Sequence, residues 1–288
     1  MRPLRLALLQ FAPTLRDVHA NIERIAQAAP ARDCDVLITP ELSLTGYSVA
    51  DDAAALALPL REGEPVPAPY HTALAAIAPA LLAGLLERPE AGSAPYNSAA
   101  LLDRGTVRHH HRKIYLPTYG MFDEARFFAR GSELRTCALP GGWRGGVLVC
   151  EDFWHPALAY ILAAAGIQVL LVLAAAPGRA VLEGGDTGAV FGSADAWERI
   201  ARTTAQLYGI YVALANRTGV EGGVTFGGGS LIVDPSGTIV AQGDAFGDAL
   251  LHVELEPAVL AAARQPYAHA RDDDPHLTLR LLREQVAR

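Results

Sequence analysis

Hydrophobic positions recur at two different periods along the first part of the chain. An apolar run at residues 4–11 predicts a strand, and apolar side chains at helical spacing predict a helix over residues 17–29. A second apolar run at residues 35–41 predicts another strand, which stops at a Pro-Glu pair before a glycine-containing loop. The Ala- and Pro-rich stretch 51–80 is expected to be a loop followed by a short helix.

Predicted strands crowd together in the second half of the chain, after one more helix at residues 193–208. The further predicted strands are residues 80–87, 97–103, 146–150, 211–216, 229–234, 238–242 and 251–255. Strands that first alternate with helices and then crowd together indicate an α/β layered sandwich with mixed sheets. No internal repeat or compositional break marks a boundary, so residues 1–288 are interpreted as one domain.

The longest apolar stretch, "ALAYILAAAGIQVLLVLAAA" at residues 157–176, is long enough to span a bilayer. Gly166 and Gln168 divide it into an Ala-rich part opened by Pro156 and a Val/Leu-rich part, and no Lys or Arg closely flanks it. We therefore predict a helix followed by a buried strand, with no membrane span. The opening "MRPLRLALLQFAP" lacks a small-residue cleavage site and is predicted to be a strand, not a secretory signal.

Composition is that of a globular protein, with 51% hydrophobic and 19% charged residues among 288. The net charge of -7 argues against a nucleic-acid partner. Three scattered cysteines (Cys34, Cys137, Cys150) do not make a disulfide framework, which favours a reducing, cytoplasmic compartment. Phosphate-loop and dinucleotide-binding motifs are absent from the sequence, so no nucleotide cofactor is expected.

The run "HHHRK" at residues 109–113 suggests a metal site, because His109 and His111 would share one face of a strand. A zinc site needs a third or fourth ligand at a recognisable spacing, and the other histidines do not supply one. The preferred interpretation is a solvated basic strand end, and no metal is predicted.

Three residues at the ends of apolar segments are candidates for chemistry. Cys150 closes a buried strand in "VLVCEDFWHP", a position where open α/β sheets place ligands. Glu41 closes another and is suited to general base work, while Lys113 is suited to stabilising a negative oxygen. Each also has a plain alternative: a buried small residue, a polar strand end and a surface lysine. Two carboxylates follow Cys150 and disfavour its thiolate, so a reactive thiol would need a base from elsewhere in the chain.

Three blocks, "PELSLTGY", "RKIYLPTYGMFDEARFFARG" and "VLVCEDFWHP", resemble in order the signature blocks of the nitrilase superfamily of carbon-nitrogen hydrolases. The similarity extends through "ALLQFAP", "NIERI", "ANRTGVEGG" and "GGGSLIVDPSG", which is nearly the whole chain. "LPTYGMFDEARFF" and "CEDFW" look most like the glutaminase domain of glutamine-dependent NAD synthetase. Nitrile-cleaving members usually carry Trp then Glu after the cysteine, so Glu151 and Asp152 disfavour nitriles. The resemblance implies a four-layer αββα sandwich with two mixed β-sheets.

The resemblance also implies the roles of individual residues. Cys150 would attack the carbonyl, and Glu41 would take the thiol proton and then deliver it to the leaving amine. Lys113 and the backbone N–H of Glu151 would stabilise the oxyanion. Glu124 matches a second glutamate that holds the lysine and helps to position the substrate.

Four residues are expected to shape the substrate pocket: Tyr119, Glu151, Trp154 and Ala176. Tyr119 matches a substrate-contacting tyrosine of the family. Ala176, before Pro177, stands where the glutaminase domains carry a serine that helps to bind the glutamine backbone. Its loss weakens the case for free glutamine and makes a different small amide plausible.

The function implied is a thiol-dependent amidase that cleaves a linear, non-peptide C–N bond through a cysteine thioester and needs no metal or cofactor. The chain lacks the ATP-using synthetase domain and its Ser-Gly-Gly-x-Asp-Ser loop, so the alternative is an idle or ammonia-supplying subunit that partners a separate synthetase. Family members typically dimerise through helices and the C-terminal tail. A homodimer or higher homo-oligomer is therefore expected, with the tail at about 265–288, which includes "LTLRLLREQ", either at the interface or frayed.

Overall fold

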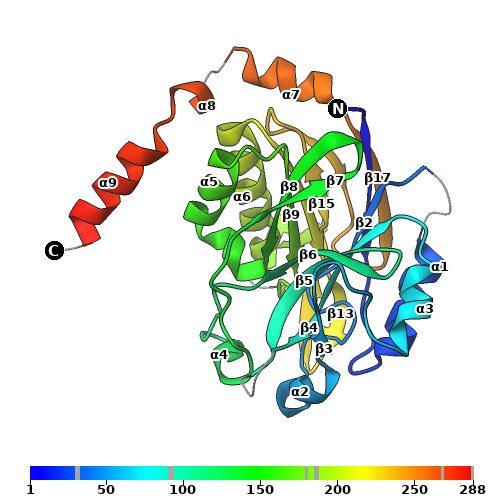
Figure 1. The fold of residues 1–288 in the computed structure, drawn as a ribbon. Coiled ribbons are helices and arrows are strands. Elements are labelled where there is room, and N and C mark those ends of the chain that lie inside the picture. Colours follow the sequence, from blue (N-terminus) through cyan, green and yellow to red (C-terminus); the bar gives the residue numbers. More distant parts are fainter. Residues whose placement is uncertain (30–32, 90–93, 179–180, 185–187, 267–268, 287–288) are drawn as a thin grey trace.

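Two β-sheets face each other and helices cover both outer faces in the computed structural model of the chain (Figure 1). The structure describes residues 1–29, 33–89, 94–178, 181–184, 188–266 and 269–286. The sequence-based prediction of a four-layer αββα sandwich with two mixed sheets is confirmed.

The first sheet is mixed, with parallel pairing of β1, β2 and β4 and antiparallel pairing elsewhere along the main path. Its strands, in order, are β17 (Ala249–Leu255), β1 (Leu4–Gln10), β2 (Val36–Ile38), β4 (Ala80–Arg88), β5 (Tyr96–Asp103) and β6 (Thr106–Arg112), and β3 (Leu58–Pro59) pairs with β4.

The second sheet has a parallel centre of β12, β9 and β8 with antiparallel strands on both sides. Its order is β16 (Ile239–Gln242), β15 (Leu231–Val233), β12 (Tyr211–Asn216), β9 (Val169–Ala174), β8 (Trp143–Val149) and β7 (Thr136–Leu139).

Helices α1 (Val18–Ala28) and α3 (Tyr70–Ala75) cover the first sheet, whereas α5 (Pro156–Ala164) and α6 (Gly192–Tyr208) cover the second (Figure 1). Side chains along β1 point alternately to its two faces, and both faces are buried. Leu4, Leu6 and Leu8 join the core shared with the second sheet, while Ala7 and Leu9 join the core beneath α1 and α3. A strand buried on both faces therefore reads as a continuous apolar run.

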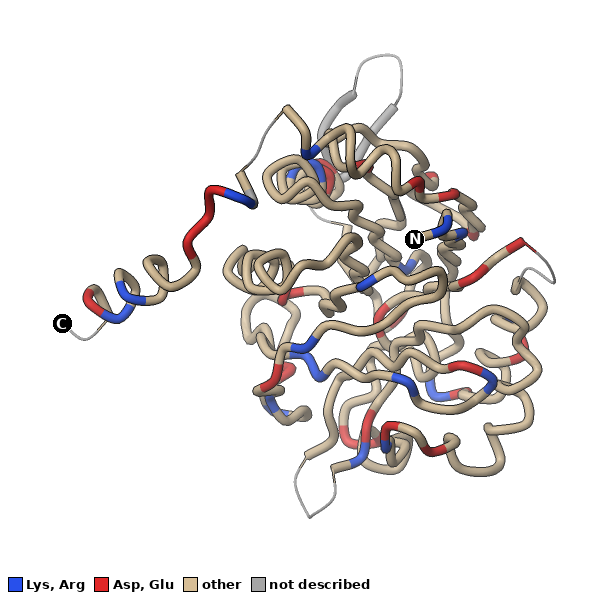
Figure 2. Tube along the Cα trace, turned by 45° about the horizontal axis from the view of Figure 1, so that its top comes forward, with Lys and Arg blue, Asp and Glu red and all other residues tan. Residues whose placement is uncertain are grey.

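The apolar stretch 157–176 lies in α5 and β9, as predicted. In the part of the chain that the structure describes, no helix is both long and apolar enough to cross a membrane. Acidic and basic residues are interspersed over the Cα trace (Figure 2). Many of them form ion pairs, such as Arg2 with Asp35 at 2.8 Å.

Several short strands were not predicted. They are β3, in the stretch predicted as a loop and a short helix, β7, in an interval taken as loop-rich, and two hairpins, β10 (Val181–Gly184) with β11 (Gly188–Phe191) and β13 (Thr218–Glu221) with β14 (Val224–Gly227). Four residues give too few repeats for a period of two to stand out against neighbouring glycines. The remaining helices are α2 (Ala53–Leu56), α4 (Glu124–Phe127), α7 (Pro257–Arg264), α8 (His269–Asp272) and α9 (Pro275–Val286).

Candidate active site

Three segments that leave the carboxyl ends of strands bring the predicted triad together. Glu41 follows β2, Lys113 follows β6 and Cys150 follows β8. Their exposed fractions are 0%, 1% and 6%, so all three side chains are removed from bulk water. Burying ionisable groups this deeply is costly unless they have partners, and such clusters of buried ionisable groups are typical of functional sites. The meeting point of these three side chains is therefore a candidate active site.

The turn that carries Glu41 depends on a glycine in the neighbouring strand. A Cβ atom on Gly84 would lie 2.3 Å from the Pro40 carbonyl oxygen and 2.4 Å from the Leu42 nitrogen. Strand β4 can therefore pass beneath this turn only with glycine at that position. Leu42 itself has a φ of 49°, which turns the chain sharply away from β2.

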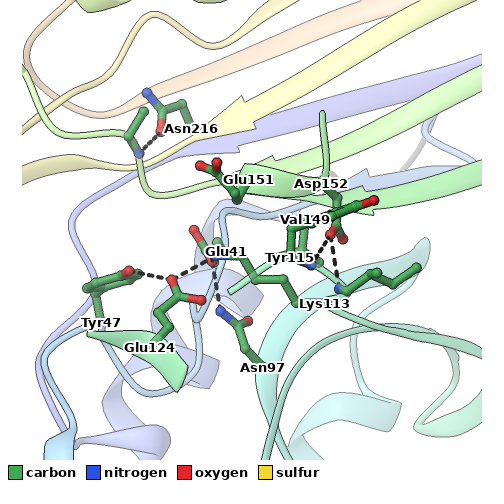
Figure 3. Close-up of polar contacts among 12 residues, drawn as sticks. Glu41, Tyr47, Asn97, Lys113, Tyr115, Glu124, Val149, Glu151, Asp152 and Asn216 are labelled. Carbon is green, nitrogen blue, oxygen red and sulfur yellow. Dashed lines mark hydrogen bonds and ion pairs between the residues drawn. The ribbon is translucent and has the colours of Figure 1, made fainter. Parts of the chain in front are cut away.

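Lys113 is held between two carboxylates (Figure 3). Its Nζ donates to Oε1 of Glu41 and to Oε1 of Glu124, both at 2.7 Å. The side-chain amide of Asn97 also donates to Oε1 of Glu41, at 2.7 Å. The other oxygen of Glu41, Oε2, is buried without a hydrogen-bond partner among the described residues. One carboxylate oxygen thus fixes the side chain, and the other is available to a substrate or a thiol.

The electrostatics of the cluster keep the lysine charged. Burial by itself lowers the pKa of Lys113, but the negative charges of Glu124 and Glu41 outweigh it and raise the pKa well above its usual value. Burial raises the pKa of Glu124 to about 7 against the opposing effect of Lys113. A permanently charged, dehydrated ammonium group is the electrostatic feature that stabilises an oxyanion.

Cys150 begins a short 3₁₀ turn, Cys150–Trp154, and has a φ of 47°, a value that side-chain-bearing residues seldom adopt. Burial and the negative charge of Glu41 raise the pKa of its thiol well above the ordinary value. The thiol is therefore neutral near pH 7 and needs a base to react.

A cavity of about 280 Å³ opens at Cys150. It is lined by Tyr119, Phe122, Cys150, Glu151, Trp154, Ala176, Pro177, Ser193 and Trp197. The four residues predicted to shape the pocket therefore share one cavity with the thiol. Tyr119 Oη donates to Oε2 of Glu151 at 2.8 Å, which fixes this carboxylate on the cavity wall. Trp154 is 42% exposed and packs edge-on against Trp197 at 5.4 Å.

Ala176 presents only a methyl group to the cavity, and its backbone is fixed. Its N–H donates to Oδ1 of Asn216 at 2.9 Å, and its carbonyl accepts from Gly227 at 3.1 Å. The wall at this point is consequently rigid and apolar.

Sequence reasoning missed several residues of the site. Asn97 holds Glu41, and Tyr47 Oη donates to Oε1 of Glu124 (Figure 3). Phe122 and Trp197 line the cavity. Tyr47 and Phe122 lie inside the quoted signature blocks, which was a usable signal, whereas an asparagine at the start of a strand gives none.

The prediction of a solvated basic strand end at residues 109–113 is wrong for two histidines and for Lys113, which is 1% exposed. His109 and His111 are 4% and 3% exposed because alternate residues of β6 face the interior. Burial lowers the pKa of His109 to about 4. Across the described residues, no group of three or more His, Cys, Asp or Glu side chains is placed to hold a metal ion.

The profile of the carbon-nitrogen hydrolase family matches residues 5–265 of this chain. The glutamine-dependent NAD(+) synthetase of Thermotoga maritima is 32% identical over 266 residues, which cover 89% of this chain and 42% of that protein. The chain thus spans less than half the length of that relative.

Two solved structures extend the comparison. A carbon-nitrogen hydrolase from Helicobacter pylori G27 shares the fold, with a TM-score of 0.81 and 24% identity over 98% of this chain and 99% of that one. A Glu-to-Gln mutant of the amidase from Nesterenkonia sp. AN1 has a TM-score of 0.71 and 27% identity over 93% of this chain and 96% of that one. That structure shows covalent addition of the acetamide moiety of fluoroacetamide at its active-site cysteine. Since the family profile covers most of its residues, this chain belongs to the carbon-nitrogen hydrolase family, within the nitrilase superfamily.

Proposed function

We propose that the protein is a thiol-dependent amidase that hydrolyses a linear, non-peptide C–N amide bond through a thioester on Cys150. One observation carries the proposal: Oε1 of Glu41 is held by Lys113 and Asn97, while Oε2 is buried and without a hydrogen-bond partner among the described residues. That oxygen can take the proton of the Cys150 thiol, which the raised pKa keeps neutral until a substrate arrives.

Acylation starts when the sulfur of Cys150 attacks the carbonyl carbon and Glu41 accepts the thiol proton. The ammonium group of Lys113 and the backbone N–H of Glu151 stabilise the negative oxygen of the tetrahedral intermediate. The C–N bond then breaks, Glu41 delivers its proton to the leaving nitrogen, and the acyl group remains on sulfur.

Deacylation repeats these roles with water. Glu41 takes a proton from the attacking water, the C–S bond breaks, and the proton returns to the thiolate, which leaves a carboxylic acid and the free thiol. Glu124 keeps Lys113 in place throughout, supported by the hydroxyl of Tyr47.

The cavity supports a small substrate. A volume of about 280 Å³ with aromatic walls from Tyr119, Phe122, Trp154 and Trp197 suits a compact amide. Ala176 itself offers no hydroxyl to the backbone of free glutamine, whereas the hydroxyl of Ser193 in the same cavity donates to the Pro177 carbonyl at 3.0 Å. A glutamine-like or other small amide is therefore proposed, and the likeness to the Nesterenkonia amidase supports it.

A second candidate is a subunit that supplies ammonia to a separate synthetase. The 32% identity to a glutamine-dependent NAD(+) synthetase favours it. This role needs the same live triad, whereas a catalytically idle scaffold has no use for a buried lysine between two carboxylates.

An ammonia-release screen tests the proposal. Glutamine, other ω-amides, carbamoyl-amines and simple aliphatic amides are incubated with the purified protein, and ammonia is measured. We expect release from at least one class by the wild-type protein and at least about 10⁴-fold slower release from Cys150→Ala. Preference for glutamine favours the ammonia-supplying candidate, and equal release by both proteins contradicts the amidase.

We propose that residues 1–288 form one carbon-nitrogen hydrolase domain that works in the reducing environment of the cytoplasm. All three cysteines, Cys34, Cys137 and Cys150, are free thiols in the structure, which fits such a compartment.

We further propose that the tail takes part in a homodimer or higher oligomer. Helix α9 extends away from the body (Figure 1), and exposed apolar side chains occur along it at Leu277, Leu279, Leu281, Leu282 and Val286. Residues 267–268 and 287–288 of the proposed tail lie outside the described residues. A helix that leaves so many leucines in water is expected to bury them against a second copy.

The sedimentation of the double variant Leu279→Asp/Leu282→Asp tests whether the tail forms the interface between copies. The double variant is expected to sediment as a monomer, while wild type and the control Glu284→Gln sediment as oligomers. An oligomer of unchanged mass in the double variant would assign the tail to a frayed terminus instead.

A further inference from the structure

Asp152 is a buried carboxylate that the proposed reaction does not use. It lies two residues after Cys150, is 0% exposed, and accepts hydrogen bonds from four donors. Burying a carboxylate in this way is costly unless every bond is made. The four donors therefore identify the segments that the Asp152 side chain holds in place.

Oδ2 of Asp152 holds the turn of the nucleophile. It accepts from the backbone N–H of Val149 at 3.2 Å, so residues on both sides of Cys150 are tied together. The φ of 47° at Cys150 is a conformation that persists only when its surroundings enforce it. This bond is part of that enforcement.

Oδ1 of Asp152 holds the segment of the lysine. It accepts from the backbone N–H groups of Ile114 and Tyr115, both at 2.9 Å, and these residues directly follow Lys113. Figure 3 shows the carboxylate between Val149 and Tyr115. A single side chain thus joins the Cys150 turn on β8 to the Lys113 segment on β6.

His111 fixes the carboxylate from a third direction. Its Nε2 lies 2.9 Å from Oδ2 of Asp152, and because a carboxylate only accepts, the ring nitrogen donates. The imidazole is buried on β6, two residues before Lys113. It therefore ties Asp152 to the strand that carries the lysine.

We propose that Asp152, oriented by His111, is a positioning residue that sets the placement of the Cys150 sulfur relative to Lys113. The inference rests on the proposed function, in which these two groups act on one carbonyl. A displacement of about 1 Å between groups that act together can lower a rate by ~10²-fold. All four donors to Asp152 lie on the two segments that carry those groups, so the carboxylate acts on their separation.

Asp152→Asn is the main test. Asparagine keeps one oxygen for Ile114 and Tyr115, but its amide nitrogen cannot accept from Val149. We expect kcat to fall by ~10²-fold with KM within about threefold of wild type, because geometry is lost and the cavity walls are not. Alkylation of Cys150 by iodoacetamide, followed by intact mass, is expected to slow by at least ~10-fold.

His111 supplies a second pair of variants that keeps the test decisive if Asp152→Asn does not fold. His111→Ala removes the donor and is expected to slow Cys150 alkylation, whereas His111→Gln places an amide N–H near the same point and is expected to recover part of the rate. A purely structural role predicts no such recovery.

Asp35→Asn is the matched control. Asp35 is also a mostly buried carboxylate, and it accepts from the Arg5 backbone N–H at 2.9 Å, but it lies at the opposite end of β2 from Glu41. This variant is expected to lose stability and to keep the wild-type alkylation rate. If Asp152→Asn keeps the wild-type kcat and the wild-type alkylation rate, the inference about Asp152 is overturned and the proposed function is not affected. Absence of both reactions in the wild-type protein would instead overturn the proposed function.

Discussion

Replacing Cys150 with alanine is expected to lower the rate of amide hydrolysis by at least about 10⁴-fold, because the thioester can no longer form. A bound water in place of the sulfur would be a far weaker nucleophile. The charged Lys113 remains in the variant, so a small residual rate above the uncatalysed reaction is expected.

Cys137→Ala is the control for this substitution. Cys137 is also a buried free thiol, and burial raises its pKa to about 12, but it lies in β7 and donates to the Gly145 carbonyl instead of lining the cavity. Ammonia release by this variant is expected to match wild type. Comparable rates in Cys150→Ala and wild type would exclude a sulfur nucleophile.

Glu41→Gln is expected to lower kcat at pH 7 by about 10³-fold, since a positioned general base contributes roughly that much. The amide keeps an oxygen for Lys113 and Asn97 but cannot take a proton. The same group also returns a proton to the leaving nitrogen, so both halves of acylation suffer.

The pH dependence of this variant distinguishes base catalysis from a loss of structure. Burial is the largest cause of the raised pKa of Cys150, and it remains in Glu41→Gln although the raising effect of the Glu41 charge is lost. Without Glu41 only the thiolate reacts, and its fraction rises with pH as long as the pH stays below that pKa. Alkylation of Glu41→Gln is therefore expected to accelerate by ~10-fold per pH unit between about 7 and 9, whereas wild type stays nearly flat.

Glu87→Gln is a control for the pH measurement. Glu87 is a buried carboxylate held by Arg112 and Ser98, and it does not line the cavity. Its variant should keep the flat wild-type profile. A flat profile in Glu41→Gln as well would show that another group removes the thiol proton.

Much of the architecture could be predicted from the sequence, because the long helices and strands have clear hydrophobic periods. The apolar runs that became β1, β4, β5 and β12 were found within a residue or two of their ends. Glu41, Lys113 and Cys150 stood out as polar or reactive groups at strand ends, and the resemblance to a family linked them. Their meeting point depends on strand order, since Lys113 and Glu41 lie 72 residues apart along the chain.

The partners of the triad were beyond sequence reasoning. Asn97 reaches Glu41 across β4, and this contact follows from the order β2-β4-β5. His111 illustrates a second limit: the two-residue period placed it on a face with His109, but only the second sheet makes that face interior. Asp152 reads in sequence as one more charge beside Cys150, although it is a fully bonded bridge between two strands.

The most direct test of the account is the detection of the acyl group on Cys150 during turnover. The protein is mixed with its best amide, quenched in acid within the first turnovers, and analysed by intact mass and peptide mapping. We predict a mass increase equal to the acyl group on the peptide that contains Cys150, removed by hydroxylamine and absent from Cys150→Ala. Sustained turnover without any such adduct, or an adduct on another residue, would contradict the account.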